Sequence, residues 1–185
     1  MGENVTNTKI ETREISIKNL FFSVIFWILT LGCCVLIFML SAESGLESSQ
    51  LSGAFLDFLN ESFNTNLTDD SLIRELAHAS EFAILTVFTY FALSSTNKIS
   101  IKSSYAESPV KLMRSDNEMS IIFTLWFTTL NAIFDEYHQL FVNDRDGNIK
   151  DVLIDAIGII IVLVIIRVVF TVYLKTKGKT EVVYT

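Results

Sequence analysis

The sequence contains few of the residues that interrupt helices, and little charge. Among 185 residues there are one proline and seven glycines, and only 19% of the residues are charged, below the usual quarter for soluble domains. Half of the residues are hydrophobic, fifteen are phenylalanine, and the mean hydropathy is +0.45. This composition favours packed apolar helices over a loop-rich fold, and the length allows one domain.

Two further shortages exclude classes of protein. The net charge is −7, whereas a protein that binds nucleic acid needs an excess of basic residues on its binding surface, so a nucleic-acid-binding protein is not expected. The only cysteines are Cys33 and Cys34, and neighbours in one helix cannot readily bridge to each other, so we expect a small apolar pair and no disulfide framework. Phosphate-loop, nucleophile-elbow and HExxH patterns are absent, and residues 1–18 lack the order of a secretory signal.

Four largely apolar runs dominate what remains. They lie at about residues 20–40, 68–93, 120–134 and 151–174, and Arg167 interrupts the last one. The first run is free of charge and long enough to span the hydrocarbon core of a bilayer. The sequence therefore predicts an all-α, polytopic membrane protein with four transmembrane helices.

The second run has its own start signal. Thr68 is a candidate N-cap, and Asp69 and Asp70 suit the positive end of the helix dipole.

Residues 42–70 are acidic and contain no lysine or arginine. Apolar residues recur there at helical spacing, which predicts a short amphipathic helix on the membrane surface or over the bundle. The alternative is a loosely ordered loop. The apolar residues are Leu51, Ala54, Phe55, Phe58, Leu59 and Phe63.

Basic residues are concentrated in alternate connections. The N-terminal segment, the polar residues 94–119 and the tail hold ten of the fourteen lysines and arginines. By the positive-inside rule, four spans then place both termini in the cytoplasm and the acidic loops outside. We predict a cytoplasmic segment at 1–18, a four-span membrane domain at 19–175 and a cytoplasmic tail at 176–185.

Three segments bring ionisable groups to the outer ends of the predicted spans. Spacings of three and four place the members of each set on one helix face. Glu81 and Asp155 lie deep enough that each should need a partner or water. The sets are Arg74, His78 and Glu81; Asp135, His138 and Gln139; and Asp151, Asp155 and Gly158.

Two interpretations give these charges no role in binding. Side chains near helix ends can extend into the headgroup region, which we expect of Glu136, Asp144, Asp146 and Lys150. Asp151 would then simply cap the fourth helix.

A third interpretation is a buried ion-pair network that only holds the helices together. In it, Arg74 and Arg145 are the partners of Glu81 and Asp155.

The functional interpretations start from charge. Five carboxylates and two arginines in these segments sum to −3, which suits a divalent cation, an amine or a pair of carboxylates that share a proton. If a divalent cation is the cofactor, the candidate ligands are His78, Glu81, Asp135, Asp151 and Asp155. Alternatively, His78 and Glu81 would form a general acid–base pair, since histidine titrates near neutrality and a carboxylate can orient it.

These residues resemble the VanZ-like membrane proteins, named for a teicoplanin-resistance protein of Gram-positive bacteria. The family's R-K-x-A-H-F-x-E-Y helix is similar to R-E-L-A-H-A-S-E-F at Arg74–Phe82. Its D-E-x-x-Q stretch, followed by an arginine, is similar to Asp135–Arg145, and its D-V-x-x-D/N-x-x-G to Asp151–Gly158. Ser48–Gln50 is similar to the family's S-S-Q, and the likeness in architecture covers about residues 20–175.

The chain departs from the family pattern at several positions. Glu75 replaces the lysine usual in the family, Ala79 replaces a phenylalanine and Phe82 replaces a tyrosine. Asn143–Asp144 replaces a common Pro-Gly turn. The change at Glu75 makes the site more acidic than in the family pattern.

The resemblance implies a multi-pass bacterial membrane protein associated with lower susceptibility to teicoplanin-type glycopeptides, and it gives no reaction. We expect binding or protection at the outer leaflet, with membrane lipid and a lipid-linked cell-wall precursor or a glycopeptide as partners. The alternatives are a membrane-embedded enzyme acting on a lipid-linked or cell-wall substrate, with His78 and Glu81 catalytic, and a structural ion-pair core that acts through partners. The expected binding residues are Arg74, Asp135, Glu136, His138, Gln139, Arg145, Asp151 and Asp155.

Overall fold

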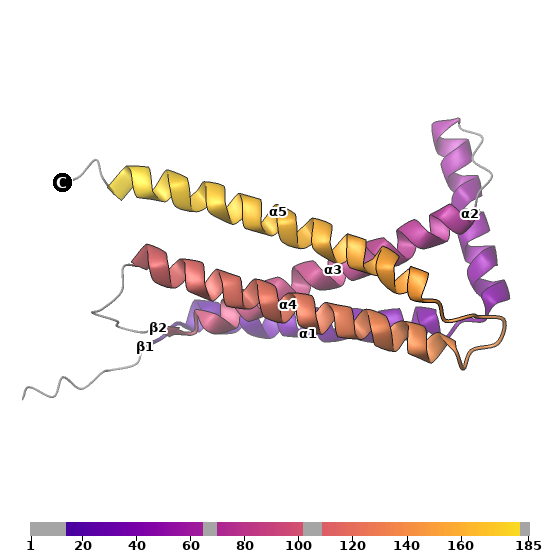
Figure 1. Ribbon diagram of the computed structural model, residues 1–185, viewed down its shortest axis with the longest axis horizontal. Coiled ribbons are helices and arrows are strands. Elements are labelled where there is room, and N and C mark those ends of the chain that lie inside the picture. Colours follow the sequence, from indigo (N-terminus) through magenta and orange to yellow (C-terminus); the bar gives the residue numbers. More distant parts are fainter. Residues whose placement is uncertain (1–13, 65–69, 102–108, 182–185) are drawn as a thin grey trace, which may run out of the picture.

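The computed structural model describes residues 14–64, 70–101 and 109–181 of the chain. The helices in these residues are α1 (Ile17–Ser41), α2 (Gly45–Phe63), α3 (Asp70–Asn97), α4 (Pro109–Gln139) and α5 (Ile149–Glu181). Two short antiparallel strands, β1 (Glu14–Ile15) and β2 (Ser100–Ile101), pair with each other. The four helices other than α2 lie along the long axis of the molecule, and α2 stands across one end (Figure 1).

Three helices in the described part of the chain are long and apolar enough to cross a membrane. These candidate spans are Ile17–Ser41, Ile73–Asn97 and Ile149–Thr176. In α4, by contrast, the charge-free stretch runs only from Met119 to Phe134 and includes threonines and an asparagine. The predicted α-helical architecture is confirmed with three candidate spans, and the fourth span stays a prediction.

Helix boundaries differ from the sequence-based expectation on both sides of the 94–119 segment. That segment was expected to be a polar connection, but α3 continues to Asn97 and α4 begins at Pro109. A proline suits the first turn of a helix, because its missing N–H would have no intrahelical partner there. The polar sequence after residue 108 is therefore not a loop. It forms the first turns of α4, and the helix becomes apolar only afterwards.

The start of α5 corrects a second expectation. Asn148 precedes the helix, and its side-chain Oδ1 accepts a hydrogen bond of 3.0 Å from the backbone N–H of Lys150. Asp151, considered above as the cap, lies instead in the first turn, where a negative charge favours the helix dipole. Thr68 and Asp69, the predicted start of α3, lie outside the described residues.

The helix predicted within residues 42–70 is present as α2, which begins with a capping box. Ser44 Oγ accepts from the Glu47 backbone N–H, and the Glu47 carboxylate accepts from the Ser44 backbone N–H at 3.0 Å. The Ser44 backbone N–H, and after it the Ser44 hydroxyl at 2.9 Å, donate to the Glu47 carboxylate and lower its pKa. The helix ends at Phe63, and the left-handed backbone of the next residue, Asn64 (φ 50°), stops the chain from continuing as a helix.

The central helix is α3, which contacts α1, α2, α4 and α5. The buried interior around it combines a small apolar cluster with many buried polar side chains, chiefly threonines and serines. Many large apolar side chains on the outer faces of the bundle are exposed, as on α5, and hydrocarbon chains of a bilayer would cover such a surface. The core residues are Ile37, Phe82, Leu85, Ala132, Ile159 and Leu163.

Gly158 lets α5 approach α3 closely beside the predicted site. A Cβ atom built on Gly158 would collide with the backbone carbonyl of Ala79, which is the residue between His78 and Ser80. Small residues of this kind allow helix backbones to pack tightly in membranes.

We predict that Gly158→Ala lowers the thermal unfolding temperature of the purified protein in detergent. The added methyl meets backbone rather than a mobile side chain, so overpacking should cost about 1–3 kcal/mol. The matched control is Gly32→Ala in α1, where a Cβ has nothing within 4 Å and alanine should be neutral or stabilising. Equal unfolding temperatures for the two variants would contradict the close contact.

Candidate functional site

One end of the bundle collects the segments that the sequence singled out. The end of α1, the start of α2, the start of α3, the end of α4 and the start of α5 meet there, opposite the strands (Figure 1). Because successive long helices alternate in direction, the three predicted sets of ionisable residues come to this same end.

A pocket of about 720 Å³ lies at this end, lined chiefly by α2 and α3. Part of its lining is apolar, with side chains from both helices. The rest is polar and includes four predicted site residues: Arg74, His78, Glu81 and Arg145. The apolar lining includes Leu51, Phe55 and Phe58 of α2 and Ile73 and Leu76 of α3.

A second pocket, of about 390 Å³, shares Arg74, His78 and Arg145 with the first. Its remaining lining is mostly polar, and α5 contributes to it through Lys150 and Asp151. The three shared side chains therefore stand between an amphiphilic hollow and a polar one.

Arg145 joins segments that are far apart in the sequence. Its Nε donates to the backbone carbonyl of Glu43 at 3.3 Å, just before α2, and its Nη1 donates to Gln139 Oε1 at 3.5 Å, at the end of α4. The neighbouring backbone strengthens this junction, since the Gly45 N–H donates to the carbonyl of Asn143 at 3.2 Å. Arg145 thus fixes the position of α2 against the end of α4, which shapes the pocket.

Gln139 is buried and connects Arg145 to Asp135. Its Nε2 donates to Asp135 Oδ2 at 2.9 Å, and Asp135 is only 6% exposed. The shared helix face predicted for these two residues is therefore a direct contact. An amide suits this position because it accepts from the arginine and donates to the carboxylate at the same time.

Glu136 differs from its prediction. We expected it to extend into the headgroup region, but it is 5% exposed, and its Oε2 accepts from the backbone N–H of Asn148 at 2.8 Å. The reason is the tight α4–α5 connection, which returns α5 alongside the end of α4. Asp144, Asp146 and Lys150, expected to be solvated, are exposed.

Asp155 is fully buried, and neither of its carboxylate oxygens has a hydrogen-bond partner among the described residues. His78 Nδ1 and Glu136 Oε1 are also buried and also have no hydrogen-bond partner among the described residues. Native proteins pair nearly all such atoms, so these three groups have unused hydrogen-bonding capacity at this end of the bundle.

His138 lies apart from the two pockets described above. Its ring packs on Phe38 of α1, with ring centroids 4.4 Å apart, and its Nδ1 lies 3.4 Å from Ser41 Oγ. With Asp135 it lines a separate hollow of about 240 Å³.

The candidate metal ligands are distributed rather than gathered. His78 and Glu81 line the first pocket, Asp151 the second, and Asp135 the hollow beside His138. In residues 14–64, 70–101 and 109–181, no group of three or more His, Cys, Asp or Glu side chains is placed to hold a metal ion.

The proposed ion-pair network is not formed in the described residues. Neither Arg74 nor Arg145 lies within 4 Å of the Glu81 or Asp155 carboxylate, and Arg145 instead donates to a backbone carbonyl and an amide. The one ion pair found in this part of the chain joins Arg167 to Glu118, near the other end of the bundle.

The sequence interpretation missed the apolar side of the pocket. The sequence predicts that Leu51, Phe55 and Phe58 share one face of a helix on the membrane surface or over the bundle, and does not predict that this face lines a pocket. Only the angle at which α2 crosses the start of α3 makes this face part of a pocket. The sequence feature that could have indicated this pocket is the i, i+4, i+7 spacing of the three apolar residues next to an acidic, serine-rich turn.

A family model described as VanZ/LLP1 matches residues 26–170, within the predicted membrane domain. Neither a curated protein nor a solved structure matches the chain.

We predict that Gln139→Leu destabilises the protein by about 1–3 kcal/mol, because Asp135 Oδ2 loses its donor while it stays buried. The measurement is thermal unfolding in detergent. Thr124→Val is the matched control: Thr124 is equally buried, but its hydroxyl has no partner among the described residues, so the isosteric change should cost little. If Gln139→Leu unfolds at the temperature of this control, the Asp135–Gln139–Arg145 chain does not stabilise the junction.

Proposed function

The chain belongs to the VanZ/LLP1 family, and from this premise we propose that it binds an amphiphile with an amine-bearing head at the outer face of the cell membrane. The observation that carries the proposal is the 720 Å³ pocket at the α2–α3 crossing, which combines an apolar lining with Arg74, His78, Glu81 and Arg145. A lipid-linked cell-wall precursor and a teicoplanin-type glycopeptide both have this chemistry. The expected consequence is lower susceptibility to such glycopeptides.

The apolar lining would hold a hydrocarbon tail. Phe55, Phe58 and Leu51 are more than half exposed, so a ligand would cover surface that water otherwise meets. Each buried CH₂ group contributes about 0.8 kcal/mol, and a tail of ordinary length would therefore supply most of the affinity.

The polar lining would select the head. Glu43 and Glu81 supply carboxylates for an amine, while Arg145 is already engaged with a backbone carbonyl and an amide. Arg74 would then meet neutral or anionic oxygens of the head, and the glutamates its cationic groups.

We propose four spans, with α4 as the fourth and both termini cytoplasmic. Polar side chains of α4 bond within their own helix: Thr128 Oγ1 donates to the Thr124 carbonyl and Asn131 Nδ2 to the Phe127 carbonyl, both at 2.8 Å. Such internal bonds make a polar helix tolerable in lipid. The start of α1 and the end of α5 lie at one end of the bundle (Figure 1), which agrees with the distribution of basic residues.

A membrane-embedded enzyme is the second candidate. It is favoured by His78, whose buried Nδ1 has no partner in the described residues and which lines the same pocket as Glu81. An enzyme would change the cell's pool of lipid-linked precursors on overexpression, and His78→Gln would abolish the change, whereas a binding protein would leave the pool unaltered.

Our first prediction for this function concerns Glu43 and Glu81, the two carboxylates of the pocket lining. In a host expressing the chain, Glu43→Gln and Glu81→Gln should each reduce teicoplanin protection toward the level of the empty vector, because the amine of the head loses its charged partner, with unchanged amounts of protein in the membrane. Asp57→Asn is the control, because Asp57 is an exposed carboxylate of α2 outside the pocket lining. Unchanged protection in both variants would refute the proposal.

A second prediction concerns a substitution that fills part of the pocket without altering its charge. Ala77→Phe on α3 adds a ring to the pocket lining and should weaken binding of a lipid-tailed glycopeptide to membranes containing the protein at least tenfold. Val168→Phe, on an exposed face of α5, is the control and should have no effect. Equal binding by both variants would place the ligand elsewhere.

A further inference from the structure

A second kind of hollow lies near the other end of the bundle, between α4 and α5. It has a volume of about 200 Å³, and its lining contains three basic residues and one acidic residue. The basic residues are Arg114 on α4 and Arg167 and Lys175 on α5, and the acidic one is Glu118. With a formal charge of +2, this hollow is opposite in sign to the acidic end described above.

Helical spacing brings these side chains together. On α5, Arg167, Thr171 and Lys175 follow each other at intervals of four, and on α4 Arg114 and Glu118 are also four apart. Each set therefore lies on one face of its helix, and the two faces oppose each other.

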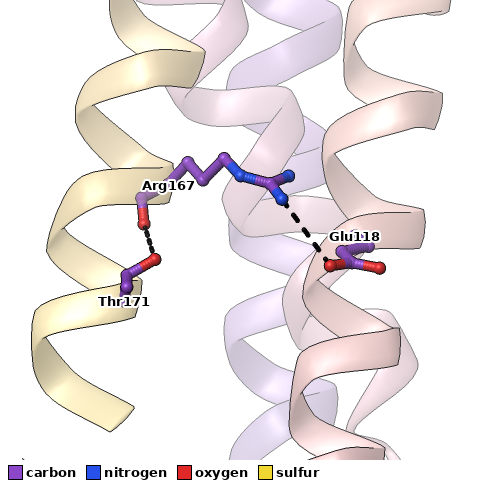
Figure 2. Close-up of polar contacts among 3 residues, drawn as sticks. All are labelled: Glu118, Arg167 and Thr171. Atoms are coloured by element: carbon purple, nitrogen blue, oxygen red, sulfur yellow. Dashed lines mark hydrogen bonds and ion pairs between the residues drawn. The ribbon is translucent and has the colours of Figure 1, made fainter. Parts of the chain in front are cut away.

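Arg167 reaches across from α5 toward α4 (Figure 2). Its Nη2 lies 3.7 Å from Glu118 Oε1, and both side chains keep much of their exposure, 61% and 46%. A guanidinium has five N–H donors, so this one contact leaves most of them unused. The Thr171 hydroxyl takes no part, since it donates to the Arg167 backbone carbonyl at 2.7 Å (Figure 2).

The depth of Arg167 suits a lipid headgroup. It lies eighteen residues after Ile149, or about 27 Å along the helix at 1.5 Å per residue. A hydrocarbon core is about 30 Å thick, so Arg167 reaches the level of one headgroup layer when the start of α5 lies in the other. Phe170 and Leu174 line the same hollow and supply apolar contacts next to the charges.

We propose that this hollow, formed by Arg114, Arg167 and Lys175, binds the phosphate of an anionic phospholipid headgroup. The arginine guanidinium groups and the Lys175 ammonium would hold the phosphate oxygens, while Phe170 and Leu174 would shield these ionic contacts from water. Glu118 holds Arg167 in place and competes with the phosphate for it. The site is separate from the pocket between α2 and α3 and binds whether or not that pocket is occupied.

The test uses the full-length protein in phosphatidylcholine nanodiscs with increasing fractions of phosphatidylglycerol, and native mass spectrometry counts the retained phosphatidylglycerol. Arg167→Gln and Lys175→Gln should each weaken retention about fivefold, as expected for one basic residue at an anionic surface. Glu118→Gln should strengthen it, because the internal competitor of the phosphate is removed. Lys18→Gln is the control: Lys18 is exposed at the same end of the bundle but lies outside the lining.

Three results would overturn the proposal. Equal weakening by Lys18→Gln and Arg167→Gln would mean that the whole basic end attracts lipid without a site. Weaker retention by Glu118→Gln, at an unchanged unfolding temperature, would mean that the glutamate is a ligand rather than a competitor. Displacement of the lipid by millimolar inorganic phosphate would identify a free anion, not a headgroup, as the occupant.

Discussion

The Arg145 guanidinium joins the turn before α2 to the end of α4, and the shape of the polar end depends on this connection. It donates to the carbonyl of Glu43 and to the amide of Gln139, which in turn donates to Asp135. In a medium of low dielectric constant such a chain of hydrogen bonds is strong, and an unpaired member would be costly. The residues that line the pocket are therefore held by polar contacts, of which the Gln139–Asp135 bond is buried and the two Arg145 bonds are partly buried.

Close backbone contacts make this arrangement possible. A Cβ atom at Gly45 would collide with the Asp144 carbonyl, one at Gly147 with the Glu136 carbonyl, and one at Gly158 with that of Ala79. All three contacts lie around the polar end, where α2, α3, α4 and α5 converge. The three glycines allow neighbouring backbone segments to come into direct contact at this end, where the ionisable side chains also lie.

The two ends of the bundle differ in chemistry in a way that suits a membrane. The outer end, in the proposed orientation, has buried carboxylates and an amphiphilic pocket, while the other end has a small basic hollow with an exposed ion pair. Between them the outer surface is apolar.

The sequence by itself determined the helices, the apolar runs and the identity of the polar residues, because periodicity and charge are local properties of the chain. It predicted that Arg74, His78 and Glu81 share a face, and the structure places all three on one pocket. Burial of Glu136, the position of His138 against Phe38 and the absence of Arg–carboxylate pairs among the candidate site residues described depend on how helices pack. The crossing of α2 over α3 was decided only by tertiary contacts, since no local pattern specifies the angle between two helices.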